Sequence, residues 1–177
     1  MNIYKCRVLA CSLVILLCNL LLIGCGSSKT TSSVNLETGV CLGCNLSGVD
    51  LSGLDWDGFN LRDSNFSDSD LRGILLEGAN LRGSNLRNVD LSNAKLLDAN
   101  LRDVDLRDAD LKEANLRGAS LRNADLSNAD LNSADLVNAD LWGADIWGAD
   151  LTSADLTGAT WVDGSICGTK RCNKKAY

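Results

Sequence analysis

The residues best suited to covalent or metal chemistry in this chain are its cysteines. Eight are present, whereas histidine, the commonest general base and metal ligand, is absent. Cys41 and Cys44 form a CxxC motif, and Cys167 and Cys172 form a second close pair. Such pairs could share a zinc ion or form two disulfides, and the CxxC motif could also act in redox catalysis. The choice depends on where the fold places the two pairs.

Acidic residues are the second group able to do chemistry. The chain carries 23 Asp and Glu against 17 Lys and Arg, a formal net charge of −6, which argues against nucleic acid as a direct partner. No nucleophile–base pair, phosphate-binding loop or dinucleotide motif accompanies the acids. We therefore expect no enzymatic activity and no cofactor.

The N-terminus has the pattern of an export signal. Two basic residues precede an apolar run over residues 8–23, which is short for a membrane span of about 20 residues. The sequence LIGC at residues 22–25 resembles the lipobox of bacterial lipoproteins. That resemblance implies cleavage before Cys25, which would then carry a lipid, and Gly26 resembles the outer-membrane sorting pattern. An uncleaved anchor helix is the alternative.

Composition divides the chain into four parts. Residues 1–24 are the expected signal peptide, and residues 25–40 are small and polar, which is typical of a flexible tether. Residues 41–168 form the expected folded domain. Residues 169–177 are a short basic tail, which could stay solvated or lie against an acidic surface or anionic lipid.

The folded domain repeats itself every five residues. A leucine or another large apolar residue, which we call the centre of its unit, recurs at every fifth position from 46 to 166, giving 25 consecutive units. Two positions before the centre the residue is small or apolar, and from Ala109 to Ala159 it is always alanine. Residues five apart on an α-helix point about 140° away from one another, so this period excludes a continuous amphipathic helix.

The unit A(D/N)LXX, as at residues 129–133, resembles that of the pentapeptide-repeat family, and residues 41–48 resemble the start of many such proteins. The match covers residues 44–168. It implies an all-β fold, a right-handed quadrilateral β-helix (a pentapeptide-repeat solenoid) with four units per coil and about six coils. Elementary physics agrees, because short units bury apolar side chains only by stacking. Leu and Ala then alternate inside, and Asp, Asn, Ser and Gly supply the corners.

Four units per coil place residues 20 apart on top of one another, which predicts two charged ladders. The ladders are Asp50, Asp70, Asp90, Asp110, Asp130 and Asp150 on one side, and Arg62, Arg82, Arg102 and Arg122 on the opposite side. Like charges repel at the strand spacing of about 4.8 Å, and Arg72 and Lys112 offset part of this repulsion. The acidic ladder could reflect only a preference of the repeat, or it could bind cations or a basic partner. Its spacing does not select calcium.

Aromatic residues near the C-terminal end are the strongest candidates for a contact surface. Trp142 and Trp147 each follow a centre, so we expect both to point outward on adjacent sides. Exposed tryptophan favours a binding role, with a second copy, a membrane or an envelope protein as the partner, and idle exposure is the alternative. The remaining large aromatic residues are expected to cover the open ends of the coils. These are Trp56, Phe59, Phe66 and Trp161.

The expected length of the rod also distinguishes between the interpretations of the cysteines. Six coils are roughly 30 Å long, so the two pairs lie at opposite ends and cannot share a zinc ion. We expect no metal site. Each pair can form a local disulfide in an exported compartment, and redox catalysis by the CxxC motif is the minor alternative.

These features predict a non-enzymatic, lipid-anchored protein of the bacterial cell envelope, at the outer membrane facing the periplasm. Its expected partners are the membrane, through Cys25, and an envelope protein or a second copy, with the β-helix as an interaction or structural module. One alternative is a DNA mimic that regulates or protects a type II topoisomerase, as some members of the family that the chain resembles do. The arginine ladder and the export signal argue against it. A second alternative is binding of cations or small molecules on the aspartate ladder.

Overall fold

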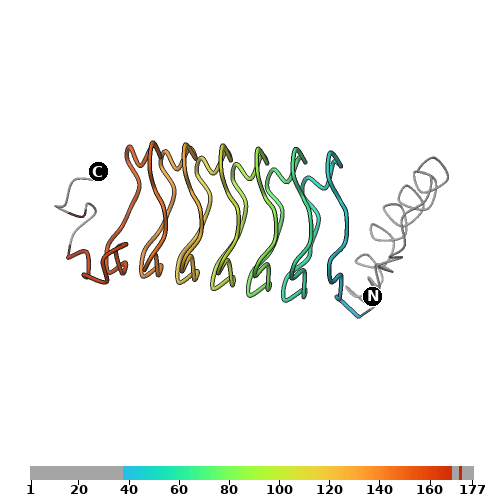
Figure 1. The fold of residues 1–177 in the computed structure, drawn as a ribbon, viewed down its shortest axis with the longest axis horizontal. Coiled ribbons are helices and arrows are strands. Elements are labelled where there is room, and N and C mark those ends of the chain that lie inside the picture. The colour runs from blue at the N-terminus through green and yellow to red at the C-terminus, as the bar shows by residue number, and fades with distance from the viewer. Residues whose placement is uncertain (1–37, 169–171, 173–177) are drawn as a thin grey trace, which may run out of the picture.

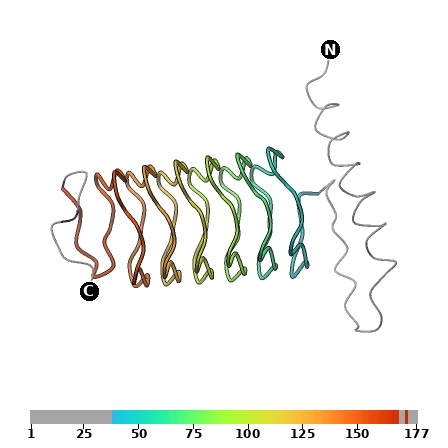
Figure 2. The same cartoon turned by 90° about the horizontal axis from the view of Figure 1, so that it is seen from above.

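The structure, a computed structural model, describes residues 38–168 and Cys172. In this part the chain winds into a right-handed quadrilateral β-helix whose coils follow one another along a single axis (Figures 1 and 2). Parallel bridges join residues 20 apart, from Val40–Asn60 to Asp140–Thr160. These bridges confirm the predicted fold of about six coils. The first bridge begins at Val40, one residue before the expected start of the folded domain.

Each five-residue unit consists of one bridge residue and one β-turn. Within residues 38–168 and Cys172 there is no helix and no strand longer than an isolated bridge residue. In the turn after Leu111, the Ala114 amide donates to the Leu111 carbonyl at 3.1 Å, and Glu113 has a φ of 56°. A turn with positive φ at its third residue favours Gly, Asn and Asp, which explains the polar corners of the repeat. No helix in the described part of the chain is long and apolar enough to span a membrane.

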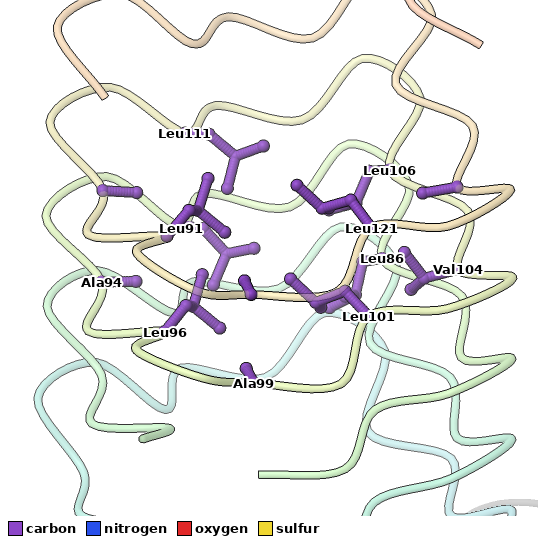
Figure 3. Close-up of a cluster of buried hydrophobic side chains, with 14 of the residues drawn as sticks. Leu86, Leu91, Ala94, Leu96, Ala99, Leu101, Val104, Leu106, Leu111 and Leu121 are labelled. Carbon is purple, nitrogen blue, oxygen red and sulfur yellow. The ribbon is translucent and has the colours of Figure 1, made fainter. Parts of the chain in front are cut away.

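The core is a column of side chains that point into the centre of the coils. Figure 3 shows leucines pointing into the interior of the coils, with Leu121 stacked on Leu101 one coil away and small residues such as Ala99 beside them. Leu101 and Leu121 are 0% exposed. Large and small residues alternate because two leucine-sized residues per side would overfill the interior. Burying one leucine contributes about 1.5–3 kcal/mol.

Three serines replace the inner small residue near the N-terminal end. Ser64, Ser69 and Ser84 are each at most 3% exposed. The Ser84 hydroxyl donates to the Leu61 carbonyl at 2.8 Å, and the Ser64 hydroxyl donates to the Cys41 carbonyl at 2.8 Å. A buried hydroxyl is tolerated where it is hydrogen-bonded, so these bonds explain why serine fits at these positions.

Aromatic rings fill the interior close to both ends. The ring of Trp56 stacks on Phe59 at a centroid distance of 5.7 Å and lies 6.4 Å from Phe66 at a tilt. Trp56 and Phe66 are 1% exposed, and Trp161 near the other end is 4% exposed. In the coils near the two ends, these rings thus fill space that leucines fill in the middle coils.

The last predicted unit is wrong. Ile166 is not an inward centre but is 66% exposed, and it forms an antiparallel bridge with Thr160. After Trp161 the chain turns back at Gly164, whose φ is 85° and whose amide donates to the Trp161 carbonyl at 2.9 Å. The reversed segment buries Cys167 instead, at 3% exposure. The five-residue repeat therefore continues in the sequence beyond the point where the last coil of the structure ends.

Candidate functional site

The aspartate ladder is part of the turn structure. Each of its six carboxylates accepts a hydrogen bond from the backbone amide two residues later, at 2.8–3.1 Å. In one example, the Ser92 amide donates to Asp90 at 3.0 Å. This side-chain turn is a reason for Asp or Asn to precede the centre whatever the protein binds. We call the side formed by units centred on 51, 71, 91, 111, 131 and 151 the aspartate side.

Two cations relieve the repulsion along this ladder, as the sequence indicates. Arg72 lies 2.5 Å from Asp70 and 3.7 Å from Asp90. Lys112 bridges two rungs in the same way, at 2.9 Å from Asp110 and 2.7 Å from Asp130. The hydrogen bond that the Arg72 side chain donates lowers the pKa of the Asp70 carboxyl. The hydrogen bonds that Lys112 donates to Asp130 and Asp110 raise the pKa of Lys112. Asp70, Arg72 and Lys112 therefore remain charged at neutral pH.

The ends of the ladder have hydrogen bonds but no adjacent cation in the same unit. The Ser52 amide lowers the pKa of Asp50, and the Thr152 side chain and amide lower the pKa of Asp150. Each carboxylate of the ladder thus accepts a hydrogen bond within its own turn. Among the described residues, no group of three or more His, Cys, Asp or Glu side chains could hold a metal ion.

The arginine ladder lies on the opposite side, which we call the arginine side. It consists of the units centred on Cys41, Leu61, Leu81, Leu101, Leu121, Leu141 and Trp161. Arg82 reaches Asp103 at 3.0 Å, and Arg62 lies 3.9 Å from Asp63. Their side chains are 51% and 44% exposed, so these ion pairs are solvated and individually weak.

The C-terminal end of the arginine ladder contacts the exposed Trp142. Arg122 pairs with Asp140 at 2.5 Å and lies over the ring of Trp142, with its guanidinium carbon 5.4 Å from the ring centroid. Trp142 occupies the place in the column where the coils below carry arginine, as its carbonyl accepts the Asn123 amide one coil below at 3.1 Å. Such a cation–π contact orients both groups, and Trp142 remains 50% exposed beside it.

The four sides differ in charge. The arginine side carries four arginines and four aspartates in residues 40–163, so its net charge is zero. The aspartate side carries seven acidic residues and two basic ones, and the two flanking sides carry six acidic with two basic, and five acidic with two basic. Only the arginine side is therefore neutral on an otherwise acidic rod.

Both predicted tryptophans lie on the surface near the C-terminal end. Trp142 is 50% exposed on the arginine side, and Trp147 is 63% exposed on the next side. The reversed C-terminal segment approaches Trp142, since a side-chain carbon at Gly164 would lie 3.4 Å from its ring. Trp147 carries more of its ring in solvent than any other aromatic residue that the structure describes.

Three exposed apolar residues were not predicted from the sequence. Val40 is 37% exposed, Leu42 is 51% exposed and Ile166 is 66% exposed. Leu42 precedes Arg62 by 20 residues, so the stacking rule could have placed it at the foot of the arginine column. Ile166 could not be found this way, because the fivefold frame assigns it to the interior.

The structure joins both cysteine pairs as disulfides at the two ends of the rod. Cys41 and Cys44 are linked with their Cα atoms 5.6 Å apart, and Cys167 and Cys172 with theirs 4.9 Å apart. Cys41, Cys44 and Cys167 are at most 3% exposed. Cys25, the predicted lipid attachment site, lies outside the described residues, as do the predicted signal peptide and most of the predicted tether and tail.

A family model described as pentapeptide repeats matches the chain in eight copies, over residues 44–83, 69–108, 84–123, 105–143 and 134–160. No curated protein is significantly similar to the chain.

Solved structures also resemble it. A pentapeptide repeat protein from the thylakoid lumen of Arabidopsis thaliana is 28% identical, with 83% of this chain and 79% of that one covered and a TM-score of 0.37. One from the cyanobacterium Cyanothece 51142 is 32% identical, with coverages of 70% and 92% and a TM-score of 0.30. The plasmid-mediated fluoroquinolone resistance protein QnrB1 is 25% identical, with coverages of 67% and 72% and a TM-score of 0.41.

Proposed function

Because the chain belongs to the pentapeptide-repeat family, whose members are generally structural or interaction modules, we propose that it is a non-enzymatic binding module of the bacterial cell envelope. A lipid on Cys25 holds it at the membrane, and its rigid β-helix presents a contact surface to another envelope protein. The observation that carries the binding role is Trp147, which is 63% exposed on a rod whose acidic ladder is committed to turns.

The rod suits a binding role because its surface is fixed in space. Backbone hydrogen bonds join each coil to the next, for example from the Leu126 amide to the Asp145 carbonyl at 2.7 Å. Trp147 stands at the upper end of one column, two residues after Asp145, whose carboxylate accepts the Trp147 amide at 3.0 Å. An indole held on a rigid backbone loses little conformational freedom on binding, which favours affinity.

Two observations support the envelope. The LIGC sequence at residues 22–25 resembles a lipobox and follows an apolar run of suitable length. The disulfides Cys41–Cys44 and Cys167–Cys172 are compatible with an oxidising compartment, because such bonds are rare in a reducing cytoplasm.

Fractionation of cells fed a labelled fatty acid tests the anchor. The wild-type protein is expected to carry the label and to sediment with outer membranes, whereas Cys25→Ala is expected to do neither. A label on both proteins, or on neither, would contradict lipidation at Cys25.

Site-specific photocrosslinking tests the contact surface. A photoreactive amino acid is placed at Trp147 and, as the control, at Ser127, which lies one coil below in the same column. We expect one discrete envelope protein to be cross-linked from position 147 and none from position 127. Equal cross-linking from both positions would contradict a contact centred on Trp147.

The acidic surface favours a second candidate function, regulation of a type II topoisomerase by mimicry of DNA. Three of the four sides have more acidic than basic residues, and the described rod has the regular charge spacing that such a mimic needs. Supercoiling assays with purified topoisomerase test this candidate directly. Inhibition by the wild-type protein that is lost in Asp110→Asn/Asp130→Asn would support mimicry, and no inhibition would exclude it.

A further inference from the structure

The arginine side collects most of the exposed apolar residues of the described chain. Five large hydrophobic residues are exposed in the described part of the chain, and four of them lie on this side: Val40 and Leu42 at one end, and Trp142 and Ile166 at the other. Val40 bridges Asn60 on this side, and Ile166 bridges Thr160. The column of arginines from Arg62 to Arg122 runs between the two apolar ends, and this is the only neutral side of the rod.

We propose that the arginine side is a docking surface for an anionic lipid bilayer, so that the rod lies flat on the membrane with its aspartate side facing away. The proposal rests on the proposed lipid anchor only for bringing the rod to the membrane. It assigns the orientation of the rod, which an anchor alone does not set.

The residues of this side match the chemistry of a headgroup region. Arginine forms two parallel hydrogen bonds to a phosphate, and a bilayer surface offers phosphates at every point along the column. Tryptophan favours the boundary between headgroups and acyl chains. Leu42 and Ile166, at 51% and 66% exposure, can enter the same boundary from the two ends.

The ion pairs of this side do not prevent docking. Arg82 pairs with Asp103 at 3.0 Å, but both side chains are at least 40% exposed, so the pair is solvated and can exchange for a phosphate. The opposite side repels an anionic surface, because its seven acidic residues outnumber its two basic ones. Charge therefore selects one of the four sides.

A second copy is a poorer occupant of this surface. If two rods packed antiparallel on their arginine sides, Arg62 would face Arg122 of the other copy, and Arg82 would face Arg102. A parallel arrangement would place each arginine against its own equivalent. Both arrangements bring like charges together in an interface from which water is excluded.

The tether is long enough for the rod to lie flat. Thr38 is the first described residue, thirteen positions after Cys25. An extended chain of that length reaches about 45 Å, which exceeds the length of roughly 30 Å expected for six coils. An anchor at Cys25 can thus accommodate either a flat or an upright rod.

Depth-dependent quenching of tryptophan fluorescence tests the orientation. The mature protein is reconstituted into vesicles of phosphatidylglycerol and phosphatidylethanolamine that carry brominated acyl chains. In Trp147→Phe the exposed reporter is Trp142. In Trp142→Phe/Trp147→Phe/Thr152→Trp the reporter occupies the same position of the same coil on the aspartate side. We expect quenching of the first reporter and not of the second, and the buried Trp56 and Trp161 give an unchanged background.

Charge variants test the arginine column. Arg82→Gln/Arg102→Gln should weaken docking by about fivefold for each arginine removed. Arg87→Gln/Arg107→Gln removes the same charge from a flanking side and should leave the quenching of Trp142 unchanged. Replacing phosphatidylglycerol with phosphatidylcholine should abolish docking by the wild-type rod.

The outcomes separate this inference from the proposed function. A labelled, membrane-bound protein with equal quenching of both reporters would keep the anchor and overturn the docking surface. Quenching of Trp142 in a protein that carries no lipid label would overturn the anchor and keep the docking surface. Sedimentation showing a dimer that Trp142→Phe breaks apart would assign the surface to a second copy and overturn the inference.

Discussion

At the scale of single residues, the space available for a side chain depends on the side chain at the same position one coil away. The side chain of Asp98 reaches over Gly118, so that a side-chain carbon at Gly118 would lie 3.3 Å from the Asp98 carboxyl carbon and closer still to one of its oxygens. Gly78, on the same column, has nothing within 4 Å. Both glycines have positive φ, at 65° and 63°. The column thus provides a matched pair in which only the steric contact differs.

We expect Gly118→Ala to destabilise the protein more than Gly78→Ala. Each substitution costs about 1–2 kcal/mol for the left-handed backbone, and only Gly118→Ala adds overpacking of roughly 1–3 kcal/mol. Urea unfolding followed by circular dichroism measures the difference. Equal losses of stability would show that Asp98 moves aside freely.

The acidic ladder leads to a second prediction for single residues. Asp90→Ala removes the acceptor of the Ser92 amide, which should cost about 1 kcal/mol of unfolding free energy, whereas Asp90→Asn keeps an acceptor and should cost less. Thermal unfolding of the two variants gives the comparison. If Asn is as destabilising as Ala, the carboxylate acts through its charge and not through the turn.

At the scale of elements, the C-terminal reversal is the least regular part of the described chain. It is held by the Gly158 amide on the Cys167 carbonyl and by the Cys167 amide on the Ala159 carbonyl, both at 2.8 Å, and by the disulfide to Cys172. In the middle coils, by contrast, each backbone segment pairs with coils on both sides. Local opening should therefore begin at this end.

Removal of the disulfide should loosen this end without unfolding the rod. Cys167→Ser/Cys172→Ser should lower the local stability of residues 158–167 by about 2 kcal/mol, because the disulfide restricts the open state. Hydrogen exchange should then be faster at the amides of Cys167 and Gly164 and unchanged at Leu101 and Leu121. Faster exchange throughout the rod would mean that the reversal holds the whole solenoid together.

At the scale of the whole molecule, the acidic groups make stability depend on pH. Hydrogen bonds and nearby cations lower the folded-state pKa of several carboxyls, namely Asp50, Asp70, Asp103, Asp105 and Asp150. At low pH the unfolded chain binds these protons before the folded one does, so stability rises with pH in that range. Protonation of the carboxyls also relieves the repulsion between them, which stabilises the fold. The loss of the local hydrogen bonds and ion pairs acts in the opposite direction.

We expect the melting temperature to be constant above about pH 5 and to fall as the pH drops through 4 towards the lowered pKa values. Thermal unfolding between pH 2 and pH 7 measures this dependence. Asp70→Asn should flatten it, because the carboxyl that pairs with Arg72 no longer titrates. A rise in stability on acidification would mean that relief of repulsion outweighs the local bonds.

The sequence by itself determined the architecture. A period of five fits neither a helix nor an extended strand, and stacking every 20 residues follows from the four units per coil that the resemblance to the pentapeptide-repeat family implies. From that rule the positions of the aspartate and arginine ladders, the cations beside Asp70 and Asp110, and the outward direction of Trp142 could all be predicted. They depend on local turn geometry, which every unit repeats.

Only the tertiary structure decided where the repeat ends and which surface differs from the rest. Ile166 keeps the fivefold frame but lies outside, because a turn at Gly164 pairs the chain with its own preceding bridge in place of a new side. Arg82 pairs with Asp103, a partner that the stacking of residues 20 apart does not by itself identify. The exposure of Ile166 beside the arginine column likewise depends on how the C-terminal end of the rod is covered. A periodic sequence specifies its interior many times over, whereas each end is specified once.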